Sequence, residues 1–341
     1  MKTTNLFYLL LLGVLISCST KEEEKNYVTF SGKIENPFGD KVFVSNLDRT
    51  YQKEIMLKED GSFSDTFNLT GMEGNMIFSD GREMTPLFLK NGDDLRLTLN
   101  TEEFDETVSY SGKGADNNNY YAKKMLLVEQ LIDAEEMIDL DSSKFENRLS
   151  EVIEKLNAHI SESKNLDSML VKSEEAELEK FKLQLQSQYN YYRQLDLEFA
   201  GKPAPNFENY TTIDGKTFSL NNLKGKYAYL DIWATWCAPC KKEIPFLKEL
   251  EKQYHDKNIA FVSISVDATK DKDKWEAMVA EKELGGIQVF ADSSWNSSFM
   301  KTLKVNSIPR FILLDPNGVI VDPNAPRPSQ KEKVNELLQV I

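Results

Sequence analysis

Two uninterrupted apolar runs in the C-terminal part of the chain constrain its fold more than any other feature. They are YAYLDIWAT at residues 227–235 and IAFVSISVD at residues 259–267. Runs of this length without polar alternation are typical of parallel strands that are buried on both faces. The segment from Pro239 to about Tyr254, which lies between them, is predicted to be a helix. The sequence therefore predicts a β-α-β unit in this part of the chain.

The rest of the C-terminal region continues the alternation of strands and helices. The segment GKPAPNF, which starts at Gly201, marks the beginning of a new domain. A second helix is predicted near residues 271–284, and RFILLDPNGVIV is predicted to form two strands joined by a type I turn. A last helix is expected near residues 330–340. We therefore assign residues 201–341 to one α/β domain.

The N-terminal part of the chain consists of short β-type runs separated by turn signals. Examples are VTFSGKI, KVFVSNL and GSFSDTFNL. This pattern predicts an all-β domain, a small sandwich or barrel, over residues 27–112. Because the segment contains no cysteine or histidine, we expect it to serve as a scaffold or docking domain rather than a catalytic one.

Residues 113–200 are predicted to form a helical region. Glycine and proline are absent between Asn117 and Phe199. Apolar residues recur there at a helical spacing, at Phe145, Leu149, Val152, Ile153, Leu156 and Ile160. We predict about three helices, one of which begins with a capping box formed by Ser143 and Glu146.

The charge balance argues against one class of function. The 341 residues include 55 acidic and 41 basic side chains, and no dense basic run is present. An acidic surface repels nucleic acids and anionic lipid headgroups. We therefore expect no nucleic-acid partner.

The first residues indicate export. One lysine precedes an apolar run, Leu6 to Ile16, that is too short to span a bilayer, so residues 1–17 are predicted to be a signal peptide. The run leads into Cys18 in a pattern that resembles the bacterial lipobox, in which the cysteine is acylated. An ordinary signal peptide with an incidental cysteine is the alternative. Residues 18–26 are interpreted as a charged tether, whose acidic run resembles the surface-export signal of some Bacteroidetes lipoproteins.

The residue types that carry chemistry are concentrated in WATWCAPCKKEIP, residues 233–245, where Cys237 and Cys240 lie three positions apart. Zinc binding is one interpretation, but no second cysteine pair is present, and no further histidine follows His255 closely enough to complete four ligands. We therefore expect no metal and no cofactor. Packing of two small hydrophobic thiols is the other interpretation, and the position of the pair argues against it.

Cys237 is predicted to lie at a helix N-terminus, because a buried strand ends at Trp236 and a helix begins at about Pro239. Unpaired amide donors and the positive end of the helix dipole favour its thiolate there, and can lower its pKa from about 8.5 toward neutrality. Cys240 follows one turn later on the same face, where it can attack a mixed disulfide on Cys237. We expect Cys237 to be the nucleophile and Cys240 to be the resolving thiol.

Residues from about Lys202 to the C-terminus resemble the thioredoxin-fold domain of the TlpA/ResA-like, membrane-anchored thiol-disulfide oxidoreductases. The motifs that carry the resemblance are PAPNF, DIWATWCAPC, Pro245 and SIPRF. The β-region resembles the domain that precedes such modules in Bacteroidetes proteins. The resemblance implies a redox-active Cys237–Cys240 disulfide and a cis-proline, Pro309, packed against it. It also implies substrate contacts at Trp236, at Pro309 and along the backbone of Ile308.

Asp231 is a carboxylate in an otherwise apolar strand, where burial is costly without a purpose or a partner. It matches the buried aspartate of thioredoxin, and the resemblance implies that it assists proton transfer at Cys240. A carboxylate that reaches solvent past a strand edge is the alternative. Glu243 and the neighbouring pair of lysines, Lys241 and Lys242, are expected to form the solvated face of the helix.

We therefore expect a multidomain protein with an all-β domain, a helical middle region and a thioredoxin fold, which acts as a thiol-disulfide oxidoreductase. The expected partners are exported proteins with dithiols or disulfides, and a transmembrane thiol reductase as electron donor. The resemblance also implies a role in cytochrome c biogenesis. The expected location is the cell envelope, lipid-anchored and facing the periplasm, with the outer membrane or cell surface left open. The direction of electron flow stays open, because it depends on the potentials of the partners.

Two other functions are alternatives to this one. Thioredoxin-fold peroxidases carry a threonine three residues before the nucleophile, whereas this chain has Ala234 there and Thr235 one position too close. The non-enzymatic alternative is an envelope lipoprotein that binds a partner and uses the cysteine pair as a staple. A disulfide across one helical turn constrains little chain, so the staple leaves the pair unexplained.

Overall fold

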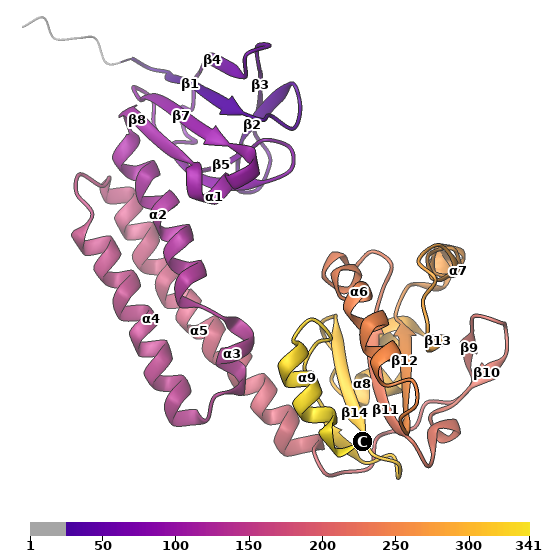
Figure 1. The fold of residues 1–341 in the computed structure, drawn as a ribbon. Helices are drawn as coiled ribbons and strands as arrows, with labels where there is room; N and C mark the ends of the chain where they lie inside the picture. The colour runs from indigo at the N-terminus through magenta and orange to yellow at the C-terminus, as the bar shows by residue number, and fades with distance from the viewer. Residues whose placement is uncertain (1–24) are drawn as a thin grey trace, which may run out of the picture. The chain divides into compact units, whose positions relative to one another are not determined.

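The computed structural model describes residues 25–341, which form two compact units. In the described part of the chain, the first unit comprises residues 25–134 together with Asp141–Lys182, and the second comprises Glu135–Leu140 and Leu183–Ile341. The predicted fold class is confirmed, since strands, then helices, then a mixed α/β region follow one another along the chain (Figure 1). Cys18 and the predicted signal peptide lie outside the described residues.

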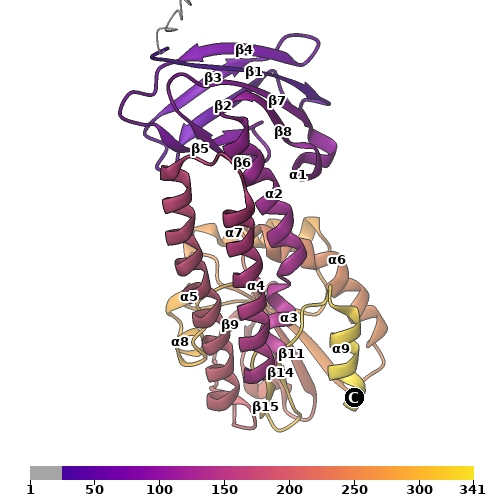
Figure 2. The same cartoon turned by 90° about the vertical axis from the view of Figure 1, so that its left-hand side faces the viewer.

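The first unit contains two four-stranded sheets that pack as a sandwich (Figure 2). One sheet has the order β4-β1-β7-β8 and the other β3-β2-β5-β6. Their apolar side chains share one core, in which the rings of Phe30 and Phe78, from different sheets, lie 6.1 Å apart. The strands are β1 (Val28–Glu35), β2 (Lys41–Asn46), β3 (Gln52–Met56), β4 (Ser62–Phe67), β5 (Gly74–Ser79), β6 (Met84–Leu89), β7 (Asp94–Asn100) and β8 (Ser109–Lys113).

Most of the helices of the middle region also belong to the first unit. The helices α2 and α4 lie beside the N-terminal part of α5 in both views (Figures 1 and 2), and Leu131, Val152 and Leu178 of these three helices share one apolar cluster. Burial of the α4 stripe agrees with the predicted helical face. The elements are η1 (Thr101–Glu103), α1 (Phe104–Thr107), α2 (Ala115–Leu131), α3 (Ala134–Asp139), α4 (Ser142–Glu162) and α5 (Ser168–Phe199).

Two details of the helical prediction are wrong. The region from residue 113 to 200 contains four helices rather than three, because the short α3 interrupts the connection between α2 and α4. The cap of α4 is Asp141, whose carboxylate accepts a hydrogen bond from the Lys144 amide at 2.9 Å. Ser143 lies inside the helix instead. Among the described residues, none of the helices is both long enough and apolar enough to span a bilayer.

The second unit is built on a seven-stranded mixed sheet with the order β10-β9-β13-β12-β11-β14-β15. The predicted β-α-β unit is present, since β11 and β12 pair in parallel and α6 connects them. The strands are β9 (Tyr210–Thr212), β10 (Thr217–Phe218), β11 (Tyr227–Trp233), β12 (Ile259–Ser265), β13 (Ile287–Phe290), β14 (Arg310–Leu314) and β15 (Ile320–Asp322). The helices are η2 (Leu220–Leu223), α6 (Ala238–Gln253), η3 (Thr269–Asp271), α7 (Lys272–Glu281), η4 (Ser294–Asn296), α8 (Ser298–Thr302), α9 (Lys331–Leu337) and η5 (Leu338–Val340).

Apolar side chains cover both faces of this sheet, as expected for a buried strand such as β11. Tyr229 packs with apolar side chains of α6 and α9 on one face. Leu230 and Ile232 point to the other face and pack with Trp275 of α7. Because side chains alternate along a strand, Asp231 shares the face of Tyr229, which is the face that α6 covers.

The C-terminal part of α5 is built into the second unit. Leu195 is fully buried and Phe199 is nearly so, and both belong to the same core cluster as Cys237 and Cys240. The compact unit therefore includes residues 183–199, which precede the boundary that we predicted at residue 201.

Candidate active site

Cys237 and Cys240 lie at the start of α6 and form a disulfide bond. Cys237 is the N-cap residue of the helix, and its sulfur accepts a hydrogen bond from the Cys240 amide at 3.1 Å. Pro239 occupies the first turn, where its missing amide hydrogen costs little. Each cysteine is only 4% exposed. An amide at the helix N-terminus, that of Cys240, therefore faces the sulfur of Cys237.

A buried hydrogen-bond network holds the loop that leads to Cys237. The carboxylate of Asp267, which follows β12, accepts hydrogen bonds from the Thr235 amide at 2.9 Å and from the Thr235 hydroxyl at 2.7 Å. The Ser265 hydroxyl donates to the same carboxylate at 2.8 Å. Since Asp267 is fully buried, these bonds fix the loop two residues before the cysteine. Sequence reasoning missed this contact, although both residues follow neighbouring parallel strands.

The surface beside the disulfide is partly apolar. Trp236 is 58% exposed, and its ring lies 6.5 Å from that of Trp295. Ile308 is half-buried and packs against the core cluster that contains the two cysteines. The Ile308–Pro309 peptide bond is cis, in agreement with the resemblance. The exposed Trp236 ring directly precedes Cys237 and is an amphipathic surface against which a polypeptide can pack.

Asp231 lies in the middle of β11 and is only 9% exposed. Desolvation by burial raises the pKa of its carboxyl to about 7, a hydrogen bond with Ser263 opposes this rise, and the charges of Glu243 and Glu251 add to it. A carboxyl with this pKa can gain or lose a proton near neutral pH. It shares its face of the sheet with α6, the helix that carries Cys240.

The expectation that Glu243 is solvated is wrong. Glu243 is only 7% exposed, and its two carboxylate oxygens accept hydrogen bonds from the amide and the hydroxyl of Ser329, each at 2.9 Å. These bonds tie α6 to the loop before α9, so the carboxylate is a buried and satisfied group. Lys241 and Lys242, by contrast, are exposed as expected.

Arg310, which follows the cis-proline, is buried and connects it to α5. Its Nε donates to the Pro323 carbonyl at 2.7 Å, and its guanidinium lies 5.9 Å from the ring centre of Tyr192 on α5. Desolvation lowers the pKa of Arg310, and burial raises the pKa of the nearby Asp322 to about 6. An arginine at the start of an otherwise apolar strand is the sequence signal for this buried cation.

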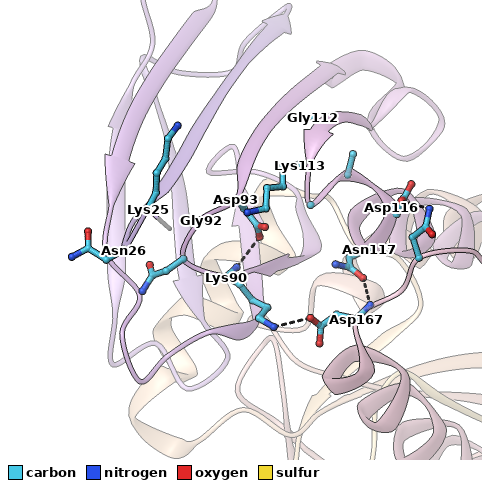
Figure 3. Close-up of a pocket in the computed structure, with 14 residues that line it drawn as sticks. Lys25, Asn26, Lys90, Gly92, Asp93, Gly112, Lys113, Asp116, Asn117 and Asp167 are labelled. Atoms are coloured by element: carbon cyan, nitrogen blue, oxygen red, sulfur yellow. Dashed lines mark hydrogen bonds and ion pairs between the residues drawn. The ribbon is translucent and has the colours of Figure 1, made fainter. Parts of the chain in front are cut away.

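The first unit also contains a polar cavity of about 780 Å³ (Figure 3). Three lysines and three aspartates are among its lining residues. Lys90 pairs with Asp167 at 2.8 Å, and the Lys90 amide donates to Asp93 at 2.8 Å. Because the charges are matched and already paired in part, the cavity presents no excess charge and no redox group. Among the described residues, no cluster of three or more side chains is arranged to hold a metal ion.

The sequence of the second unit is similar to those of known thiol-disulfide oxidoreductases. Residues 199–341 match the family model Redoxin. The thiol-disulfide oxidoreductase ResA of Bacillus cereus is 33% identical over 141 residues, which cover 41% of this chain and 78% of the relative. The thioredoxin-like protein YneN of Bacillus subtilis is 32% identical over 138 residues, with coverage of 40% and 78%. The solution structure of a putative thiol-disulfide oxidoreductase from Bacteroides vulgatus is 48% identical, covers 42% of this chain and 93% of that chain, and has a TM-score of 0.36.

Proposed function

This chain belongs to the ResA family of thiol-disulfide oxidoreductases, and we propose that it reduces disulfide bonds of exported proteins through Cys237 and Cys240. The observation that carries the proposal is the position of Cys237 as N-cap of α6 with Cys240 bonded to it one turn later. The exposed ring of Trp236 and the cis-proline loop beside the pair support a polypeptide as the substrate.

In the proposed reaction the reduced enzyme donates two electrons. The thiolate of Cys237 attacks one sulfur of a substrate disulfide, the substrate S–S bond breaks, and the released substrate sulfur takes a proton. The thiol of Cys240 then loses its proton to the Asp231 carboxylate and attacks the sulfur of Cys237. The second substrate sulfur leaves and takes up a proton. The products are a substrate dithiol and the Cys237–Cys240 disulfide, which is the oxidised form.

Each residue around the pair has a role in this scheme. The helix N-terminus stabilises the Cys237 thiolate. Asp231 acts as a base toward Cys240, because a pKa of about 7 lets it accept a proton near neutral pH. Trp236 and Pro309 contact the substrate, whose strand pairs with the backbone of Ile308. A transmembrane thiol reductase returns the electrons, and apocytochrome c is a substrate that fits the resemblance.

We further propose that the protein acts in the cell envelope from a lipid anchor at Cys18, facing the periplasm. The short apolar run and the lipobox-like residues before Cys18 support an anchored, exported protein. A periplasmic orientation suits a reductase that receives electrons from the inner membrane. The acidic run after Cys18 supports the alternative of surface exposure. Protease treatment of intact cells distinguishes the two, since only a surface-exposed protein is cut.

Trapping of mixed disulfides tests the proposed function. Cys240→Ser should hold substrates covalently on Cys237, because the resolving thiol is missing, and mass spectrometry then identifies them. Cys237→Ser is the matched control, since it keeps one thiol in the same site but removes the nucleophile. Equal trapping by both variants would refute the assigned roles. If Cys240→Ser traps no protein in cells although the wild-type pair still titrates, the binding-lipoprotein alternative is favoured.

The peroxidase alternative receives no support from the site. Thr235 is the threonine nearest to Cys237 on its N-terminal side, and its hydroxyl donates to the buried carboxylate of Asp267 at 2.7 Å. That hydroxyl is therefore engaged in holding the loop.

A further inference from the structure

The first unit contains an apolar cavity of about 670 Å³ that the redox reaction does not use. It lies between one face of α2, the first turns of α5 and the strands β5 and β6, all of which belong to the first unit. On α2 it is lined by Tyr121, Met125 and Val128, which are spaced to lie on one face of a helix. A cavity of this volume can hold several side chains of a bound peptide.

The floor of the cavity is preformed by hydrogen bonds among its walls. The Tyr121 hydroxyl donates to Asn75 at 2.9 Å, and the Asn75 amide donates to the Ser173 hydroxyl at 2.9 Å. The Tyr120 hydroxyl donates to Glu174 at 2.6 Å. These bonds join β5, α2 and α5, so a ligand would not have to order these three elements around the cavity.

The walls above this floor are apolar and adaptable. Met76, Pro86, Met125 and Val128 line the cavity, and Leu47 on its rim is 66% exposed. Methionine side chains are flexible and polarisable, so they can pack against ligands of different shapes. Such walls fit a partner whose apolar side chains vary in sequence, as those of unfolded polypeptides do.

The charges around the cavity favour a partner of one charge sign. Four carboxylates line it, on Asp105, Glu129, Glu174 and Glu177, against the single cation Lys124. Lys124 is already paired with Glu174. Burial, and to a smaller extent the charge of Glu106, raises the pKa of Asp105. The excess of negative charge favours a cationic partner and repels anionic lipid headgroups.

We infer that this cavity is a docking site for a short polypeptide segment that carries lysine or arginine beside apolar side chains. The inference rests on the proposed function for the nature of the partner, because a reductase of exported proteins meets its substrates as unfolded chains. Docking on the first unit raises the effective concentration of the substrate for the Cys237–Cys240 pair on the second. The cavity thereby affects recognition of protein substrates without taking part in thiol exchange.

Three ten-residue, cysteine-free peptides test the binding. They share a core of leucine and phenylalanine and carry flanking lysines, glutamates or glutamines. In calorimetric titration of the full chain in its disulfide form, the lysine peptide should bind at least tenfold more tightly than the glutamate peptide, with the glutamine peptide between them. Added salt should weaken binding of the lysine peptide. Equal affinity for all three peptides, or preferential binding of the uncharged amphiphile dodecyl maltoside, would overturn the inference.

Paired variants locate the binding. Met125→Gln keeps the length of the side chain but removes its apolar character, and Met56→Gln is the matched control on β3, where Met56 is 59% exposed. Glu129→Lys reverses one rim charge, and Glu59→Lys makes the same change at an exposed turn outside the cavity. Both cavity variants should bind the lysine peptide five- to tenfold more weakly than the wild type does. Both control variants should bind it less than twofold more weakly. Unchanged affinity in the exposed Glu129→Lys variant would refute the site even if Met125→Gln fails to fold.

Turnover measurements distinguish a failure of this inference from a failure of the proposed function. Glu129→Lys should raise KM for an unfolded protein disulfide several-fold while kcat stays the same. Its rate with the small disulfide 5,5′-dithiobis(2-nitrobenzoate) should equal that of the wild type. If the wild type reduces neither substrate, the proposed function fails, whereas the peptide titrations still decide the docking site. If KM does not change, the cavity has no role in substrate capture.

Discussion

Asp231→Asn is expected to change how the stability of the second unit depends on pH. Desolvation raises the pKa of Asp231 from 3.8 to about 7, so the folded state holds this proton more tightly than the unfolded state does. The protonated carboxyl therefore contributes stability that is fully present below about pH 4 and is lost as pH rises through about 7. Asparagine has a similar shape and does not titrate, so the variant should not show this loss.

The size of the effect follows from the two pKa values. The interval between 3.8 and about 7 corresponds to roughly 4 kcal/mol of unfolding free energy. Between pH 4 and pH 8, the variant should therefore gain roughly 4 kcal/mol of stability relative to the wild type. The stability difference between the variant and the wild type should change most steeply near pH 5 to 6, by about 1.4 kcal/mol per pH unit. Near pH 4 the two proteins should be about equally stable, because the wild-type carboxyl is then neutral.

Urea unfolding without reductant, followed by tryptophan fluorescence, measures this difference. All four tryptophans of the chain lie in the second unit, at positions 233, 236, 275 and 295, so the signal reports on that unit alone. Asp256→Asn is the control, because the Asp256 side chain is 99% exposed. A stability difference between Asp231→Asn and wild type that stays flat from pH 4 to pH 8 would refute the reasoning.

The same substitution tests the proposed role of Asp231 as a base. Release of the substrate by Cys240 should slow by roughly ten- to a thousandfold, and its rate should no longer increase as pH passes through about 7. Formation of the mixed disulfide on Cys237 should change far less. Stopped-flow traces of both steps decide the question, since an unchanged release step leaves Asp231 a purely structural residue.

Three further substitutions or labelling experiments have defined outcomes. After reduction, Cys237 should react with iodoacetamide faster than Cys240 at neutral pH, because only Cys237 is the N-cap of α6; equal rates would remove the helix-dipole argument. Thr235→Val removes a hydroxyl that donates to the buried Asp267 carboxylate, so urea unfolding should show a loss of about 1–3 kcal/mol, whereas Thr235→Ser should recover most of it. Cys18→Ala should release the protein from the membrane fraction, and unchanged fractionation would indicate a different anchor.

The backbone of the second unit was predictable because its signals are local. The two apolar runs, the proline after the first cysteine and the turn in RFILLDPNGVIV each fix an element from a few neighbouring residues. The α4 stripe was predictable for the same reason, since its spacing alone identifies the buried face. Its cap was not, because both Asp141 and Ser143 are good capping residues and the choice depends on where the backbone of α4 begins.

The missed contacts of the site depend on residues that are far apart in the sequence. The local sequence predicts that Glu243 lies on a solvated helix face, because its hydrogen-bond partner, Ser329, is 86 positions later in the chain. The bond between Thr235 and Asp267 spans 32 positions. It could have been inferred from the parallel pairing of their strands, which brings the two C-terminal ends to the same edge. The apolar cavity of the first unit had no local signal, because two strands and two helices must meet to form it.

The burial of Leu195 and Phe199 in the core around the cysteines has a consequence for how the redox unit can be isolated. A fragment that begins at residue 201 would leave the apolar surface under these two side chains open to water. Such a fragment should bind hydrophobic dyes and aggregate, whereas one that begins at residue 183 retains the covering helix. Limited proteolysis should accordingly leave the last turns of α5 attached to the domain that they cover.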